Sequence, residues 1–569
     1  MKPALFAAVL AIAVVPSLAQ AQGFDPAAES RNYSKTGERA VRDSDPAFQA
    51  QLRQESVLSY QEAVEILASD RERDFSGNLC WQHNDGCAGD VRLYHWGENG
   101  FGDVTPVLWT ARNGATISGH LWSTKAGPAG RRPGVVITPG SVQAPEELYL
   151  FAATTLAKAG YVVLTFDVQG QGRSDTYGEA PDRNEGVPSQ AAQPFYDGTE
   201  DALDFFLSTP SSPFKPRPSC TTGTDHAPKH TRRVTEGFNA AFNPLHGQLE
   251  RDRIGLAGHS LGAAAVSFVG QKDPRVDAIV AWDNLRAPPI GVTACPSAAA
   301  SREQPPITKP ALGMSNDYAL FAGPYTAAPD PAARNQASLA FSKAGVDSMQ
   351  INLRGGTHFE YAYIPNSAFG ATLRGIDAAA WYTQAWFDRV LRTDPSADAR
   401  LLTRRWHDDA AGKAVDPDGD GNLLSAYLRS RYDLRRGAGR VVCEDLRAGT
   451  CQELVANDGR PANYSYLEQA RTPDAAGTGT ASKTTLKAPC RSRRVVTISL
   501  RLRRRERLRS VVVRTGGERP VTRRAARRVV RVSFKGRPKG TVRVRIAVTT
   551  RGGRRYAFTR AFRTCAPRR

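Results

Sequence analysis

The sequence lacks several features that would place it in common protein classes. Beyond its first residues it has no apolar run of the roughly 20 residues that a membrane-spanning helix needs, so a transmembrane protein is not expected. None of its eight cysteines lies in C-x2-C spacing, which disfavours a zinc site. Acidic residues are scarce in residues 486–569, which hold 29 Lys and Arg against 2 Glu.

The net positive charge of the chain comes from this C-terminal part. The whole chain has a net charge of +20 and residues 486–569 carry +27, which leaves −7 for the rest. Such a surface either reflects compositional bias or binds an anionic polymer of the cell envelope. The part has few aromatic side chains on which bases could stack, so nucleic acid is not the expected partner.

The first residues are typical of a secretory signal peptide. Lys2 precedes an apolar run from Ala4 to Val15, and the small residues of Ala19-Gln20-Ala21 follow. We predict that residues 1–21 are removed and that the mature protein is secreted, either extracellular or attached to the cell envelope. A membrane anchor is the alternative, but the run is short for one.

An even number of cysteines suits an oxidising compartment, and proximity suggests four disulfides. The predicted pairs are Cys80–Cys87, Cys220–Cys295, Cys443–Cys451 and Cys490–Cys565.

Short apolar strands alternate with amphipathic helices from about Thr105 to Leu391. Alternation of this kind predicts an α/β fold with a doubly wound, mostly parallel sheet, which we assign to residues 105–400. A hairpin is expected around Asn113-Gly114. Strands are expected at Pro106–Ala111, Thr116–Trp122, Gly134–Thr138, Tyr161–Phe166, Arg253–Ala257, Val276–Trp282, Ala311–Met314 and Ser348–Leu353. Helices are expected at Glu146–Gly160, Asp197–Leu207, Leu261–Val269 and Ala378–Leu391.

Two insertions and several flanking segments complete this organisation. Residues 210–250 and 286–306 are predicted as lid insertions, with plain surface loops as the alternative. Residues 22–104 form an N-terminal extension in which Pro46–Leu67 has helical spacing, and a covering or docking role is expected for it.

The C-terminal segments have a different character. Residues 401–485 are predicted as a connector and linker. Asp416–Asn422 resembles the start of a calcium loop, but Tyr427 stands where that pattern needs a bidentate Glu, which favours a polar turn. Period-two alternation in residues 486–569 predicts a small antiparallel β-sandwich.

The most informative stretch is Gly258-His259-Ser260-Leu261-Gly262. It lies between a predicted strand and a predicted helix of small, apolar residues. A sharp strand-to-helix turn lifts its apex side chain clear of the sheet and crowds the positions two before and two after, which must then be small. The pattern therefore predicts Ser260 as an exposed nucleophile.

A serine at such a turn needs a base and a residue that orients the base. His358, in Gly355-Gly356-Thr357-His358, follows the last expected strand and is the candidate base. The acid should follow a strand between the two. Asp317 is our first candidate and Asp283, at the end of the preceding strand, is its rival.

Four stretches in this order give residues 105–391 a resemblance to the α/β-hydrolase family. They are Pro139-Gly140-Ser141, Asp167 to Ser174, Gly258 to Gly262 and Gly356-Thr357-His358. The resemblance implies that Ser260 is the nucleophile, His358 the general base, Asp317 the orienting acid, and the amides of Leu261 and Ser141 the oxyanion hole. It implies no metal and no organic cofactor. The chain departs from many relatives in having Pro139 where they carry His.

These features predict a secreted serine hydrolase that cleaves carboxylic esters, in small molecules, lipids or polymers, through an acyl-enzyme. A serine peptidase on the same fold is the alternative within this class. A surface-binding protein with a catalytically idle hydrolase fold is the alternative outside it. Dehalogenase and epoxide-hydrolase chemistry needs an aspartate at the turn, where this chain has Ser260.

Overall fold

The structure is a computed structural model in two compact units, Met1–Thr478 and Gly479–Arg569. It describes residues 45–78, 80, 87–125, 130–141, 143–187, 192–290, 304–316, 335–353, 356–364, 373–403, 430–444, 446, 464–474, 495–500, 507–515, 521–523, 529–534, 540–552 and 555–564. The boundary between the units falls inside the segment 475–485 that the sequence suggests as a linker.

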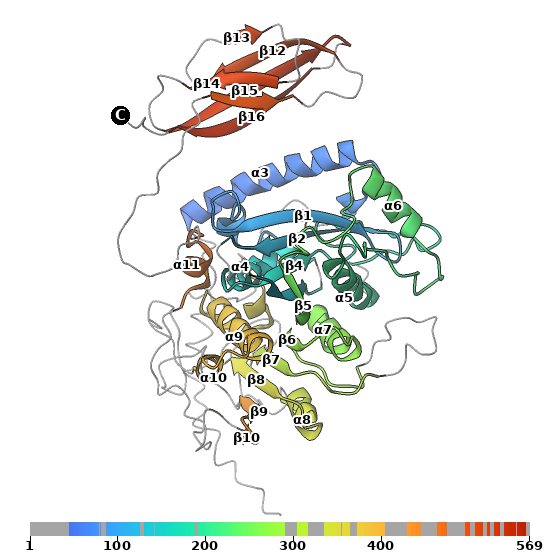
Figure 1. Cartoon of the computed structure of the whole chain (residues 1–569), viewed down its shortest axis with the longest axis vertical. Coiled ribbons are helices and arrows are strands. Elements are labelled where there is room, and N and C mark those ends of the chain that lie inside the picture. Colours follow the sequence, from blue (N-terminus) through green and yellow to red (C-terminus); the bar gives the residue numbers. More distant parts are fainter. Residues whose placement is uncertain are drawn as a thin grey trace, which may run out of the picture. The chain divides into compact units, whose positions relative to one another are not determined.

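A ten-stranded sheet forms the centre of the first unit, in the order β1-β2-β4-β3-β5-β6-β7-β8-β9-β10 (Figure 1). Strands β4, β3, β5, β6, β7 and β8 are parallel, and the flanking pairs β1–β2, β2–β4, β8–β9 and β9–β10 are antiparallel. The α/β class with a mostly parallel sheet is thus confirmed. The strands are β1 Asp103–Thr110, β2 Thr116–Ser123, β3 Arg132–Thr138, β4 Val162–Phe166, β5 Leu249–His259, β6 Ala278–Trp282, β7 Ala311–Asn316, β8 Ser348–Leu353, β9 Arg431–Arg436 and β10 Gly439–Cys443.

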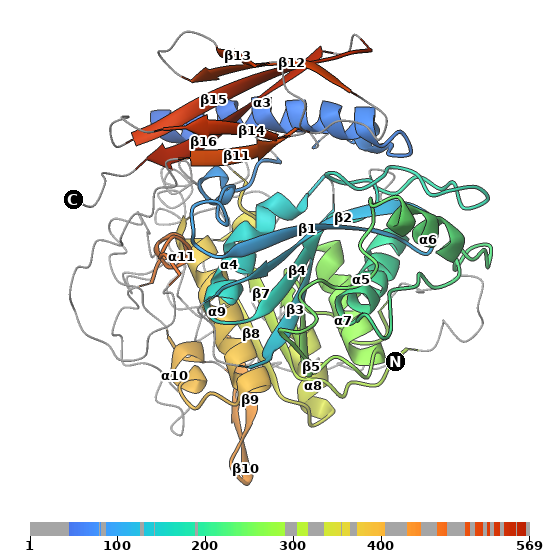
Figure 2. The same ribbon diagram turned by 45° about the horizontal axis from the view of Figure 1, so that its top comes forward.

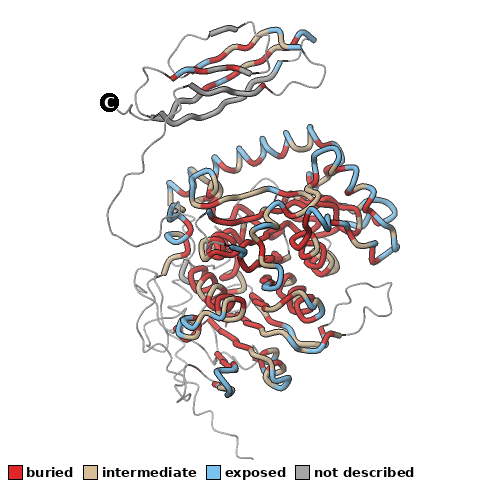
Figure 3. The backbone as a smooth tube through the Cα atoms, viewed as in Figure 1, coloured by how far each residue is buried: buried red, intermediate tan, exposed pale blue. Residues whose placement is uncertain are grey.

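Helices cover both faces of this sheet (Figure 2). On one face α4 (Leu150–Lys158) and α9 (Leu373–Arg392) share an apolar core with the strands. On the other, α5 (Gln193–Phe206) and α7 (Leu261–Lys272) share a second core. Strands β3, β4 and β6 are consequently buried along their length, as the red tube in Figure 3 shows.

The smaller helices lie at the edges of this arrangement. They are α6 (Ala227–Thr235), α8 (Gln336–Lys343), α10 (Ala397–Leu401), α11 (Tyr466–Ala470) and the short 3-10 turns η1 (Phe75–Gly77), η2 (Val91–Leu93), η3 (Glu146–Tyr149) and η6 (His358–Tyr361). The helix expected over Glu146–Gly160 thus divides into η3 and α4. In the part of the chain that is described, no helix has the length and apolarity needed to cross a membrane.

The N-terminal extension packs on the rest of the first unit through α3 (Pro46–Ser69), whose packed face carries both apolar and polar residues. Phe48, Leu52 and Ala63 are buried together with Glu55 and Ser59. Glu55 lies 3.0 Å from a ring nitrogen of His95, and Ser59 accepts a hydrogen bond from Arg173. Since these polar residues take core positions, four apolar side chains of the helix stay exposed, at Val57, Leu58, Tyr60 and Val64.

The segment predicted as a connector adds two strands to the same sheet. β9 pairs with β8, and β10 pairs with β9. The sequence of β9 begins with a charged residue, Arg431, that is 1 % exposed and whose guanidinium binds Glu444 at 2.7 Å. A buried charged residue thus stands at a position of the strand where an apolar residue would make the strand recognisable in sequence.

The insertion 210–250 contains a helix, α6, that packs on the N-terminal extension. Its helix α6 places Arg233, which is fully buried, 2.6 Å from Asp70 at the C-terminal end of α3. Residues 291–303 of the second insertion lie outside the described residues, as do Asp416–Asn422. The Cys80–Cys87 disulfide is present. Cys220 and Cys443 are also disulfide-bonded, but their predicted partners Cys295 and Cys451, and the pair Cys490–Cys565, lie outside the described residues.

The second unit is built of antiparallel strands. β11 pairs with β14, while β13, β12, β15 and β16 form a four-stranded sheet. Side chains from both sheets share one apolar cluster, which includes Val530 and Val532 from one and Val511 and Ile546 from the other, as a β-sandwich requires. The strands are β11 Val495–Ser499, β12 Leu508–Thr515, β13 Val521–Arg523, β14 Val529–Ser533, β15 Gly540–Thr550 and β16 Arg555–Thr564.

Candidate active site

Ser260 stands at a sharp turn between β5 and α7. Its backbone has φ 57° and ψ −118°, a conformation that L-residues other than glycine rarely adopt, and its N–H donates to the carbonyl of Trp282 at 3.0 Å. The glycines on either side are required by close backbone contacts. A Cβ on Gly258 would lie 2.4 Å from the Gly262 oxygen, and one on Gly262 would lie 2.3 Å from the Pro139 oxygen. The strand–turn–helix geometry expected for this motif is therefore present.

His358 opens η6, just after β8, and carries an acidic partner. Its Nδ1 lies 2.6 Å from Oδ2 of Asp283, which directly follows β6. Both side chains retain partial access to solvent, at 16 % and 12 %. Because β5, β6 and β8 are parallel, their carboxyl ends bring Ser260, Asp283 and His358 to one edge of the sheet.

The carboxylate bound to His358 thus belongs to Asp283, the rival of Asp317, which the sequence favours. Asp317 follows β7 directly and lies outside the described residues. Asp283, like Ser260, has a positive φ, 38°. Its N–H donates to the carbonyl of Met314 at 2.8 Å, a bond to the end of the neighbouring strand β7. Two residues at one site with unusual backbone conformations are typical of functional positions.

The loop after β3 runs past the serine. A Cβ on Gly140 would lie 3.2 Å from the Ser260 Cβ, which brings Ser141, the next residue, beside the turn. Leu261 is the first residue of α7, where backbone N–H groups have no partner within the helix. The two amides expected for an oxyanion hole therefore belong to segments that meet at Ser260.

Gln171 holds this loop in place, a role that its sequence position did not reveal. Its side-chain Nε2 donates to the carbonyls of Gly140 at 3.0 Å and Ala144 at 3.2 Å, while Oε1 accepts from the Ala144 N–H at 3.1 Å. Gly170 and Gly172 on either side have φ of 87° and 47°. Their spacing is the signal that was available, because it marks a tight turn that aims the residue between them.

Asp167 stabilises the turn that contains Gly170, Gln171 and Gly172. Its buried carboxylate accepts the N–H groups of Glu146 and Arg173, each at 2.8 Å. Burial raises its pKa well above the ordinary value, and the nearby carboxylates of Glu147 and Glu146 raise it further. Asp167 therefore has a structural role in the loop.

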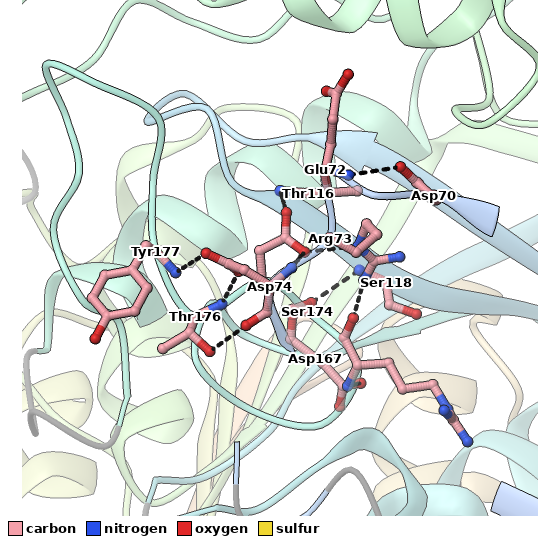
Figure 4. Close-up of polar contacts among 12 residues, drawn as sticks. Asp70, Glu72, Arg73, Asp74, Thr116, Ser118, Asp167, Ser174, Thr176 and Tyr177 are labelled. Atoms are coloured by element: carbon pink, nitrogen blue, oxygen red, sulfur yellow. Dashed lines mark hydrogen bonds and ion pairs between the residues drawn. The ribbon is translucent and has the colours of Figure 1, made fainter. Parts of the chain in front are cut away.

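The N-terminal extension binds the loop after β4, the one that contains Asp167 and Gln171, from its outer side (Figure 4). Arg73 binds Asp175 at 2.7 Å, and the carboxylate of Asp74 accepts the N–H groups of Thr176 at 2.7 Å and Tyr177 at 3.3 Å. Asp175 also accepts the N–H of Thr116, at the start of β2. The extension therefore stabilises the segment that carries Gln171, and its docking role is structural.

A cavity of about 290 Å³ opens beside the loop that follows β4. It is lined by the β1–β2 turn, the first half of α5, Gln169 and the segment around Cys220. Burial raises the pKa of Asp197, in its wall, to about 7. Asp197, Glu200 and Asp201 all bind Arg112, which lies buried between the turn and the helix. Among the described residues, no group of three or more His, Cys, Asp or Glu side chains is arranged to hold a metal ion.

The crowding at the turn predicts that Gly262→Ala destabilises the protein far more than Gly270→Ala in the same helix. The added methyl at 262 meets the backbone oxygen of Pro139, which cannot yield. At 270 it meets Cδ1 and Cγ1 of the Ile279 side chain, each at 2.6 Å, and this side chain can move more easily than a backbone oxygen. We expect a loss of about 3 kcal/mol or more in the free energy of unfolding for Gly262→Ala and about 1 kcal/mol for Gly270→Ala, measured by urea denaturation. Equal stability of the two variants would contradict this account of the turn.

Comparison with known proteins adds no relative to this description. The chain matches no protein-family model, and no curated protein is similar to it at a significant level. The assignment of a function therefore depends on the geometry at the edge of the sheet.

Proposed function

We propose that the protein is an α/β-hydrolase that cleaves carboxylic esters through an acyl-serine intermediate. The observation that carries the proposal is the 2.6 Å pair of His358 and Asp283 at the sheet edge where Ser260 stands on a turn with φ 57°. A nucleophile at such a turn, a histidine after the last parallel strand and a carboxylate on the imidazole Nδ1 form the constellation of Ser-His-Asp hydrolases. The acid in this proposal is Asp283.

The mechanism follows from these positions. Ser260 Oγ attacks the ester carbonyl while His358 Nε2 accepts its proton. Asp283 holds the Nδ1–H of His358 and stabilises the imidazolium that forms. The amides of Leu261 and Ser141 donate to the oxyanion of the tetrahedral intermediate, and each such donor is worth about 3 kcal/mol. His358 then protonates the leaving alcohol, and water releases the acyl group by the reverse sequence of proton transfers.

Export of the enzyme is part of the proposal. It is supported by the signal-like residues 1–21 and by the Cys80–Cys87 disulfide, which persists in oxidising compartments. A serine peptidase would use the same three side chains, so substrate class is a matter for experiment.

The first experiment measures hydrolysis of p-nitrophenyl esters from acetate to palmitate, beside peptide anilides. We expect ester turnover by the mature protein and a loss of about 10⁴-fold or more in kcat for Ser260→Ala, because the nucleophile is absent. A fluorophosphonate probe should label the unmodified protein at Ser260. Anilide turnover without ester turnover would make the protein a peptidase. Absence of both turnover and labelling would leave an idle hydrolase fold.

A second experiment separates the two candidate acids. Asp283→Asn should lower kcat by about 10³- to 10⁴-fold, because an amide NH₂ facing Nδ1 favours the wrong imidazole tautomer. Asp317→Asn should lower it less than about threefold. The reverse ranking would return the role to Asp317. Thermal melting of both variants checks that each remains folded.

A binding role for the Gly479–Arg569 unit is the second proposal. Arg514 of β12 lies directly opposite Arg545 of β15, and both are exposed on the outer face of the four-stranded sheet, as is Arg555. Like charges opposite each other are unfavourable unless an anion lies between them. Strands β12, β15 and β16 contain no acidic residue to serve as that anion. We propose that this face binds an anionic polymer of the cell envelope.

Co-sedimentation of the full chain with poly(glycerol phosphate) tests this role. The triple variant Arg514→Gln, Arg545→Gln, Arg555→Gln should bind about tenfold more weakly at 0.1 M salt, and binding should weaken steeply as salt rises. Arg131→Gln, Arg183→Gln, Arg251→Gln removes the same charge from exposed sites on the first unit and should bind as the unmodified chain does. Equal binding of the two triple variants would refute the proposal, as would tighter binding of single-stranded DNA.

A further inference from the structure

A buried chain of hydrogen bonds connects the segments of the candidate site. The N–H of Gly140 donates to the Tyr149 hydroxyl oxygen at 2.8 Å. That hydroxyl lies 2.9 Å from Nδ1 of His259, and Nε2 of His259 lies 2.9 Å from the main-chain oxygen of His358. Tyr149 and His259 are 1 % and 3 % exposed.

The partners fix the direction of every bond in this chain. The carbonyl of His358 can only accept, so Nε2 of His259 carries a proton and donates. Since the Tyr149 oxygen already accepts from Gly140, its own O–H donates to Nδ1 of His259, which must be unprotonated. Burial lowers the pKa of His259 well below its ordinary value, and the neighbouring His358 lowers it further, so the neutral ring that this arrangement requires is the stable one.

The chain joins the three segments whose relative placement decides the chemistry. Gly140 precedes Ser141 in the loop after β3, which we call the oxyanion loop. His259 precedes Ser260, and the carbonyl belongs to His358 itself. Ring contacts reinforce the hydrogen bonds. The imidazoles of His259 and His358 lie 4.5 Å apart between centroids, and Tyr149 stacks on Trp282, the residue before Asp283, at 6.2 Å and 3°.

We infer that His259, together with Tyr149, is a positioning residue that sets the oxyanion loop and the imidazole of His358 relative to Ser260. The inference rests on the proposed hydrolase function. His259 has no role in proton transfer, because both of its ring nitrogens are already bound to structural partners. Its contribution is to the alignment of reacting groups, where a displacement of about 1 Å can cost about 100-fold in rate.

The test compares variants that break the chain with one that removes a buried hydroxyl elsewhere. Tyr149→Phe and His259→Leu should each lower kcat for p-nitrophenyl acetate by about 10- to 100-fold and change KM less than about threefold. The double variant should be little worse than either single one, because both break the same chain. Tyr161→Phe, which removes an equally buried O–H bonded to Asp388 at 2.7 Å, should retain kcat. His259→Gln should recover part of the loss, since its amide can accept from Tyr149 and donate to His358.

Each outcome decides the question. Unchanged kcat in Tyr149→Phe and His259→Leu overturns the inference, and so does a kcat loss in Tyr161→Phe as large as theirs, which would reflect destabilisation alone. Should His259→Leu fail to fold, Tyr149→Phe and His259→Gln carry the comparison, with thermal melts alongside. Fluorophosphonate labelling of the unmodified protein separates the two proposals. If it labels Ser260 and the variants match it in kcat, only the positioning role fails. If the probe does not label the unmodified protein and this protein does not hydrolyse esters, the hydrolase proposal fails and the inference fails with it.

Discussion

The backbone turn at Ser260 is the constraint on which the site depends. A non-glycine residue in such a conformation costs about 1–3 kcal/mol, and it persists only where its surroundings hold it. Here the backbone oxygens of Thr138 and Pro139 lie so close to Gly262 on one side that they leave no room for a Cβ. The Ser260 N–H is bonded to the end of β6 on the other. The turn thus ties together the carboxyl ends of β3, β5 and β6, so the loops that follow these strands start from fixed points.

Those loops are held by polar side chains buried behind the site. Loops at the edge of a sheet expose backbone N–H and C=O groups that neighbouring strands do not satisfy, and burial makes each unpaired group costly. Gln171 forms hydrogen bonds with three such groups in the oxyanion loop. Asp167 accepts hydrogen bonds from two, one of them in the turn that carries Gln171. Tyr149 and His259 do the same between the oxyanion loop and His358. The side chains of the proposed triad are therefore positioned by residues outside it.

The parts of the site that could be predicted from sequence are those fixed by local structure. Ser260 was recognisable because the strand, the turn and the helix are contiguous, and His358 because it follows the last parallel strand. The choice between Asp283 and Asp317 could not be made, because both follow strands between the serine and the histidine. Which of them meets Nδ1 depends on the paths of two loops through space. Gln171, Tyr149 and His259 escaped notice for a related reason, since their partners lie between 9 and 110 positions away in the chain.

The fold shows the same limit where a buried polar or charged side chain stands at a position that an apolar residue usually fills. Apolar periodicity identified the core strands, but it could not indicate that Glu55 and Ser59 of α3 are buried, where they contact His95 and Arg173. It also missed β9, which begins with the buried, charged Arg431.

Two ion pairs are buried on both sides and hold the N-terminal extension: Arg233–Asp70 joins it to α6, and Arg73–Asp175 joins it to the loop after β4. A buried pair adds little net stability over apolar packing, whereas leaving either charge unpaired costs about 3–5 kcal/mol. A shifted register at these junctions would separate each pair. The pairs therefore fix where the N-terminal extension docks, and through the Asp167–Tyr177 loop that docking position is transmitted to Gln171 and the oxyanion loop.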